Sequence, residues 1–216
     1  MVHELLVEAP PLRSAAVARA VSERQAEAEA EVARILEGAY RLIRRDGTME
    51  PNLRDLLAEV GLANRSFYRH FSSKDDLLLV MLEDVQRRLT SFVAERMAAQ
   101  RTAVGQVRAW VLGVLQQAVD EETARLGRPF LVHGPRLQDA YPDVYRVTGA
   151  ALLDLLEAAI RSGVSSRKLR SRDPRADARA IFHLTLAVMQ SHVLDRTVPS
   201  EQEQAAVLDF ALRAMR

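Results

Sequence analysis

The segment from Leu62 to Phe71 carries a dense set of hydrogen-bonding side chains. Its apolar members, Leu62, Phe67 and Phe71, can pack inward as core residues. The others are polar or charged, and no acidic residue interrupts them: Asn64, Arg65, Ser66, Tyr68, Arg69 and His70. Guanidinium, amide and hydroxyl groups of this kind hydrogen-bond to phosphates and base edges. The wider segment from Arg41 to Lys74 holds seven Lys or Arg residues and four Asp or Glu residues, so this region is locally basic.

Two short helices on either side of Gly61 would position these side chains. Asn52 is placed to cap the first helix, whose apolar face is Leu53, Leu56, Leu57 and Val60. Gly61 ends it, and the second helix runs from about Ala63 to Phe71. Two helices joined by such a tight turn are the pattern of a helix-turn-helix, in which the second helix fits the major groove while the first crosses the backbone.

The rest of the chain has helical periodicity, and strand-like alternation is nearly absent. Ser22 and Gln25 predict the start of the first helix as a capping box, and Gly47 predicts its end. Ser73 and Asp76 predict the start of a long helix to about residue 99. Further helices are expected at 104–124, 142–162, 175–196 and 201–215. The stretch 125–141 holds two prolines and two glycines and is expected to form short turns and loop.

Residues 1–21 are expected to be weakly ordered, as a leader segment. Arg13, Arg19 and Arg24 leave one alternative open, in which an extended arm enters the minor groove of DNA.

The run NLRDLLAEVGLANRSFYRHFSSKDDLL, from Asn52 to Leu78, resembles the signature of the tetracycline-repressor (TetR) family. The resemblance covers about residues 30–82. The shared features are Asp55, the Gly61 turn, Tyr68, the His70-Phe71 pair, and Ser73-Lys74 followed by Leu77.

The resemblance implies a role for each matching side chain. Tyr68 and His70 would hold phosphates or lie against a thymine methyl, and Lys74 would hold a phosphate at a helix N-terminus. The side chains that would face the groove are Asn64, Arg65, Ser66 and Arg69, and Asn52 would complete the DNA-binding set. The chain departs from the family at three positions: Asn52 replaces the usual Thr, Ala63 replaces Ser or Thr, and Arg65 stands where Gly is frequent. The operator sequence of relatives therefore does not carry over.

The last two helices are apolar around more than one face. Residues Ala180 to Met189 read AIFHLTLAVM, and the final helix is similar. We expect one side to pack on the domain and the other on a second subunit, as the resemblance also implies; simple internal burial is the alternative. The expected interface residues are Leu186, Val193, Leu208 and Leu212.

The second half also holds large side chains suited to a pocket for a small apolar or amphipathic ligand. These are Trp110, Phe130, Tyr145, Phe182, His183 and Met189, for each of which core packing is the alternative. His183 and His192 lie nine residues apart, nearly on opposite sides of one helix, and the chain has no cysteine. No metal site or cofactor is therefore predicted.

Composition excludes several other classes of protein. Apolar residues make up 48% of the chain but aromatic residues only 5%, which favours helices, and a net charge of +1 requires any DNA-binding patch to be local. No secretory signal, membrane span, P-loop or nucleophile elbow is present, so a cytoplasmic protein that is not an enzyme is expected.

The predicted fold is all-α, with a three-helix helix-turn-helix domain at 22–74 and a helical ligand-binding and dimerisation domain at 75–216. The predicted function is ligand-responsive regulation of transcription, as a homodimeric repressor on palindromic double-stranded operator DNA. The alternative is a DNA-binding protein of this fold without a small-molecule effector, either architectural or controlled by a protein partner.

Overall fold

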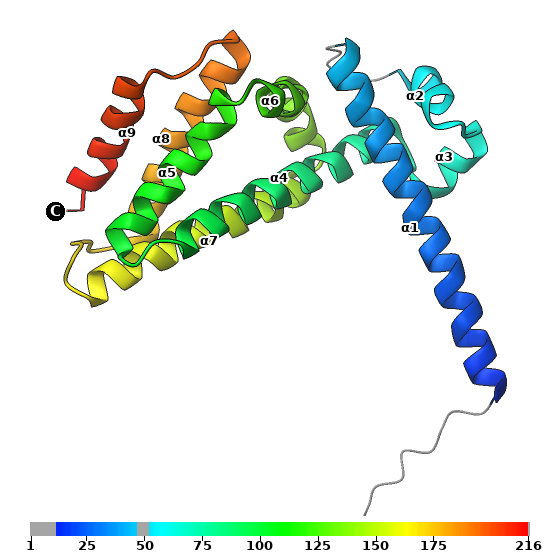
Figure 1. Ribbon diagram of the computed structural model, residues 1–216, viewed down its shortest axis with the longest axis horizontal. Helices are drawn as coiled ribbons and strands as arrows, with labels where there is room; N and C mark the ends of the chain where they lie inside the picture. Colours follow the sequence, from blue (N-terminus) through cyan, green and yellow to red (C-terminus); the bar gives the residue numbers. More distant parts are fainter. Residues whose placement is uncertain (1–11, 47–51, 216) are drawn as a thin grey trace, which may run out of the picture.

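The computed structural model describes residues 12–46 and 52–215, and every regular element within them is an α-helix (Figure 1). The all-α prediction is confirmed for this part of the chain. The helices are α1 (Leu12–Asp46), α2 (Leu53–Val60), α3 (Asn64–His70), α4 (Lys74–Ala98), α5 (Ala103–Val119), α6 (Glu121–Ala140), α7 (Pro142–Ser165), α8 (Pro174–Asp195) and α9 (Glu201–Arg213).

Local sequence rules set the boundaries of the two short helices. The side chain of Asn52 accepts a hydrogen bond from the backbone N–H of Arg54 at 2.9 Å, as its capping role requires. Gly61 has a φ of 65°, a left-handed conformation that costs glycine little. Ser73 Oγ accepts from the Asp76 N–H at 3.1 Å and starts α4. These three predictions are confirmed.

Helix α1 is longer than the sequence analysis predicted. It begins at Leu12 rather than Ser22, and Figure 1 shows its first turns extending away from the other helices. Residues 12–21 are rich in alanine and contain no helix breaker, so helix propensity continues the helix upstream of the expected cap. From Leu12 onward this segment is helical rather than an extended arm, so Arg19 and Arg24 lie on a helix, and the expectations for residues 1–11 and for Gly47 lie outside the described residues.

The prediction of loop at 125–141 is wrong. Helix α6 runs through that stretch with Pro129 and Pro135 inside it. Asp120 separates α6 from α5 and caps it, accepting from the Thr123 N–H at 2.8 Å. Pro129 is buried with Phe130, and burial of this face offsets the backbone hydrogen bond that Pro129 cannot make, whereas Pro135 is exposed.

Two hydrophobic cores share helices α4 and α6. The first core joins α1, α2 and α3 to the first turns of α4 and to Phe130 and Leu137 of α6. The second joins the later part of α4 to α5, α7, α8 and α9 around the fully buried Trp110. Since α4 contributes to both cores, a displacement of the helices around one core can be transmitted through α4 to the other. In the described residues, no helix is both long enough and apolar enough to span a membrane.

Candidate nucleic-acid interface and adjoining cavity

Helix α3 separates an inner aromatic face from an outer polar one. Phe67 is fully buried and stacks on Phe71, with ring centroids 5.1 Å apart, so both are core residues as predicted. Tyr68 is 58% exposed, and its ring stands edge-on to Phe67 at 5.3 Å. The side chains of Asn64, Arg65 and Arg69 are also exposed. The structure therefore brings four of the predicted residues together on one accessible surface.

His70 does not belong to that outer surface. Its side chain is 10% exposed, and its Nε2 lies 2.7 Å from Oε2 of Glu31 on α1. The same carboxylate lies 3.8 Å from Nη1 of Arg69, whose Nη2 donates to Ser66 Oγ at 3.1 Å. The hydrogen bond from His70 is the main cause that lowers the pKa of Glu31. Sequence analysis missed this acidic neighbour because it lies on another helix.

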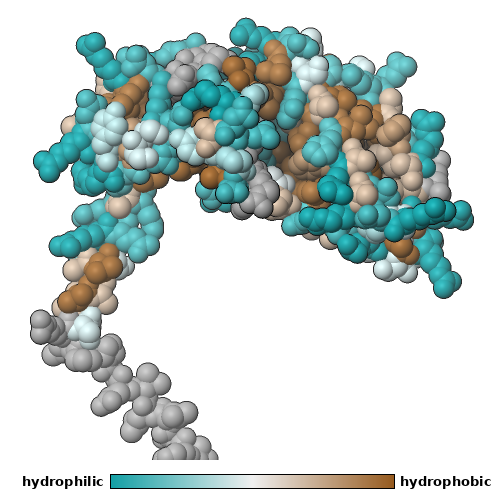
Figure 2. Space-filling model, turned by 180° about the vertical axis from the view of Figure 1, so that it is seen from behind, coloured by the Kyte–Doolittle hydropathy of each residue, from teal (hydrophilic) through white to brown (hydrophobic). Residues whose placement is uncertain are grey.

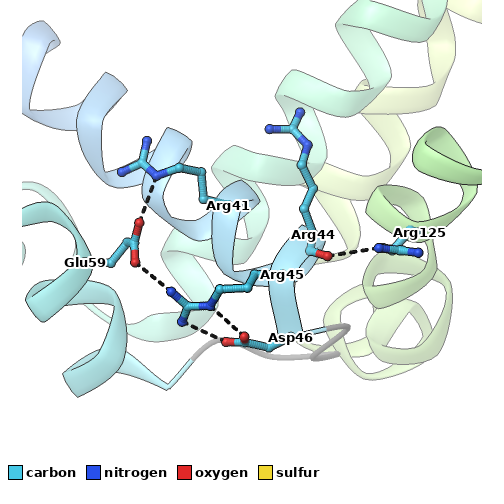
Figure 3. Close-up of polar contacts among 6 residues, drawn as sticks. All are labelled: Arg41, Arg44, Arg45, Asp46, Glu59 and Arg125. Atoms are coloured by element: carbon cyan, nitrogen blue, oxygen red, sulfur yellow. Dashed lines mark hydrogen bonds and ion pairs between the residues drawn. The ribbon is translucent and has the colours of Figure 1, made fainter.

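The C-terminal end of α1 is tied to α2 and α6 (Figure 3). Glu59 of α2 accepts from Arg41 at 3.0 Å and from Arg45 at 3.1 Å, and these bonds, first that of Arg41, lower its pKa. With Arg44, which lies 2.8 Å from Glu122, and Arg69 beside Glu31, four of the seven basic residues counted in the sequence are thus paired with an acid. Arg125 of α6 donates to the backbone carbonyl of Arg44 at 3.0 Å. The number of basic side chains available to bind DNA is therefore smaller than the seven counted in the sequence.

The N-terminus of α4 holds Lys74 next to two acidic residues that already have partners. Asp76 accepts from the Ser72 N–H at 2.9 Å. Asp75 accepts two bonds from Arg136 of α6, at 2.7 and 2.8 Å, and this pairing is the main cause that lowers its pKa. A second contact therefore joins α6 to the helix-turn-helix region. Lys74 is half-buried, and Asn52 is exposed at the start of α2.

A cavity of about 300 Å³ lies among α4, α5, α6 and α8, with Leu152 of α7 at its wall. Three of the predicted pocket residues line it: Phe130, Phe182 and Met189. Trp110 does not, because it is fully buried and donates its indole N–H to the Leu152 carbonyl at 2.8 Å.

Of the other two predicted pocket residues, His183 lies away from the cavity and Tyr145 stays a prediction. His183 is exposed and does not line the cavity, and the side chain of Tyr145 lies outside the described residues. Sequence analysis also missed four glutamines that line the cavity: Gln86, Gln117, Gln138 and Gln190.

Three of the four residues predicted at a dimer interface are buried within the single chain, and the fourth is half-buried against the same core. Val193, Leu208 and Leu212 are between 2% and 8% exposed, and Leu186 lies at the cavity wall. They therefore fill their own core, which was the alternative reading of the apolar pattern. The large apolar side chains that α8 and α9 do expose are Leu194, at 45%, and Phe210, at 61%. Among the described residues, no group of three His, Cys, Asp or Glu side chains could hold a metal ion.

Residues 35–81, from the core of α1 to the first turns of α4, match the model of a family described as bacterial regulatory proteins, tetR family. The N-terminal part of the chain therefore carries the segment by which tetR-family regulators are defined. The protein is a DNA-binding transcriptional regulator, and the surface of α3 lies inside the matched segment.

Similar proteins extend the likeness over most of the chain. A curated relative, the nucleoid occlusion factor SlmA of Cronobacter sakazakii, is 24% identical over 170 residues, which are 78% of this chain and 82% of the relative. A TetR transcription regulator from Haloarcula marismortui has a TM-score of 0.70 at 16% identity, covering 87% of this chain and 98% of its own. The regulator FadR of Bacillus subtilis in complex with stearoyl-CoA has a TM-score of 0.66 at 16% identity, covering 85% and 98%. At these identities, the solved structures show a shared fold.

Proposed function

We propose that this protein is a dimeric repressor that binds a near-palindromic operator through α3 and leaves it when a small molecule fills the cavity. The observation that carries the proposal is the position of α6. This helix lines the cavity, and it also bonds to Asp75 at the start of α4 and to the Arg44 carbonyl at the end of α1.

The proposed DNA contacts divide into base readers and phosphate holders. Arg65 and Asn64 are exposed on α3, and we assign them to base edges, since an arginine can bond guanine through two N–H groups. Tyr68 and Lys74 are assigned to phosphates, with Arg69, Ser66 and Asn52 as further polar contacts. His70 instead holds α3 against α1 through its hydrogen bond with Glu31.

A selected operator tests this division. A site chosen by the protein from a random DNA library should lose about 1–3 kcal/mol of binding to Arg65→Ala and little to Arg172→Ala, a matched change in the exposed loop between α7 and α8. Lys74→Ala should weaken binding to selected and random DNA alike. If Arg65→Ala weakens both kinds of DNA equally, the assignment of a base reader is wrong.

The proposed dimer face is the exposed side of α8 and α9. The small or apolar side chains on it are Ala180, Ala187, Leu194, Ala206 and Phe210. Figure 2 shows apolar surface gathered over the half of the molecule that carries the C-terminal helices. Phe210→Asp should turn a dimer into a monomer in sedimentation, because a charge would then lie in the buried centre of the interface. A wild-type chain that sediments as a monomer of 24.1 kDa at micromolar concentration contradicts the proposal.

The proposed switch is a displacement of α6 by the ligand. A ligand that enlarges the cavity pushes α6 outward, and Arg136 and Arg125 pass this movement to α4 and α1. Arg136→Gln should leave operator affinity nearly unchanged while reducing the ligand's effect on it, since the paired side chains are partly exposed and contribute little stability. The coupling expected in the unmodified protein is about 1–3 kcal/mol, or roughly 5- to 150-fold in affinity. Full ligand response in this variant would rule out the α6–α4 contact as the path.

The alternative is a DNA-binding protein of the same fold that takes no small-molecule effector. The likeness to a nucleoid occlusion factor favours it. A ligand that binds the cavity with equal affinity in the presence and absence of operator would support this alternative.

A further inference from the structure

We propose that the effector is an uncharged molecule with an apolar body, held by the amide groups of four glutamines. This inference rests on the proposed function and names the chemical class of the ligand for the same cavity.

The cavity wall contains no ionisable side chain among the described residues. Leucine, valine, methionine and phenylalanine form most of it, and the polar side chains are Thr123, Gln86, Gln117, Gln138 and Gln190. A charged ligand group held among the apolar side chains of this wall would lose its water without gaining a counter-ion, which costs several kcal/mol. The wall therefore selects against both carboxylates and amines.

Three arginines on the helices that form the cavity already have other partners. Arg88 donates to Asp84 at 2.8 Å, and Arg128 donates to the Val193 carbonyl at 2.8 Å. The guanidinium of Arg96 lies 4.9 Å from the centre of the Phe92 ring. None of the three lines the cavity, so none is placed to neutralise an enclosed anion.

Each of the four main walls contributes one glutamine. Gln86 comes from α4, Gln117 from α5, Gln138 from α6 and Gln190 from α8. The side chain of Gln117 donates to the Gly113 carbonyl at 3.4 Å, beyond the usual range for a strong bond. The side-chain amides of the other three make no hydrogen bond to a described residue, and that of Gln138 is exposed at the mouth of the cavity.

An amide both donates and accepts, so these side chains match neutral groups such as amides, hydroxyls and ketones. A volume of about 300 Å³ holds roughly ten water molecules, which sets the size of a small ligand.

Three probes with the same eight-carbon chain separate the charge classes: octanamide, octanoate and octylamine. The melting temperature of the full-length protein should rise by about 5 to 10 °C with octanamide at a hundredfold excess over its Kd. It should rise much less with octanoate or octylamine. Equal or larger shifts with octanoate or octylamine overturn the inference. The absence of any shift with millimolar octanamide also overturns it.

Two variants of Gln190 test whether its amide group binds the ligand. Gln190→Leu should weaken octanamide binding by roughly 2- to 13-fold, the value of one hydrogen bond, whereas Gln190→Lys should favour octanoate. Gln106→Leu is the matched control, because Gln106 lies on α5 outside the cavity. If Gln106→Leu and Gln190→Leu weaken binding equally, the glutamine assignment is wrong.

The failures of the two proposals are distinguishable. Release of DNA by octanoate would leave the proposed function standing and refute the neutral ligand. Octanamide binding that ignores operator DNA would support the neutral ligand and refute the switch.

Discussion

Gly38 lies where α1 packs against α2, and adding one methyl group there should tilt the helix-turn-helix. A Cβ at this position would lie 2.2 Å from Cγ1 of Val60 and 3.2 Å from Cδ1 of Leu56. Carbon atoms in favourable contact are about 3.5–4.0 Å apart, so α2 must move by roughly 1.3 Å or more, or Val60 must change rotamer.

The stability effect of Gly38→Ala is the difference between two terms. Overpacking of this kind costs about 1–3 kcal/mol, and replacing glycine by alanine in a helix returns about 1 kcal/mol. The free energy of unfolding should therefore fall by about 0–2 kcal/mol, which lowers the melting temperature by up to about 8 °C in a chain of this size. Operator affinity should fall by roughly tenfold or more, because α3 moves with α2.

Calorimetry and DNA titration of four proteins would test this reasoning. Gly38→Ala combined with Val60→Ala should recover both stability and DNA binding, since the second change removes the obstructing methyl groups. Gly149→Ala is the control, because a Cβ on this helical glycine meets nothing within 4 Å and should be neutral or stabilising. If Gly38→Ala behaves like this control, close packing at Gly38 does not fix α2.

Two further changes address buried polar groups. Asp84→Asn should lower the free energy of unfolding at pH 7 by about 1.5–3 kcal/mol, measured by denaturant titration, because the carboxylate accepts from Arg88 at 2.8 Å and from the Tyr40 hydroxyl at 3.1 Å. Burial alone would raise the pKa of Asp84, but its hydrogen bonds hold the pKa below the ordinary value, so its contribution is present above about pH 4 and is lost as the pH falls through the folded-state pKa. The unmodified protein should therefore lose more stability between pH 5 and pH 3 than the variant, and parallel pH profiles would contradict this. Trp110→Phe should cost about 1–3 kcal/mol through the lost bond to the Leu152 carbonyl and the space left behind, and an unchanged melting temperature would show that this bond is unimportant.

Local chemistry explains what the sequence could predict. The caps at Asn52 and Ser73 and the left-handed Gly61 depend on residues at most three positions away, and all three were found. The inward face of Phe67 and Phe71 follows from helical spacing alone. These features do not require knowledge of any other helix.

The incorrect predictions concern features that depend on residues distant in the sequence. His70 faces Glu31, which lies 39 positions away, so its orientation depends on how α1 is placed. The rule that proline ends helices failed in α6 because Pro129 is buried on a packed face. An apolar pattern around α9 could not show that Leu208 is covered by its own chain while Phe210 remains exposed.

One measurement tests the coupling of cavity and DNA surface most directly. The affinity of the best small-molecule binder from the thermal screen is measured by calorimetry with and without saturating selected operator. Because linkage is reciprocal, the operator should raise the ligand's Kd by the same roughly 5- to 150-fold factor by which the ligand weakens DNA binding. An identical ligand Kd in the two titrations would contradict the account.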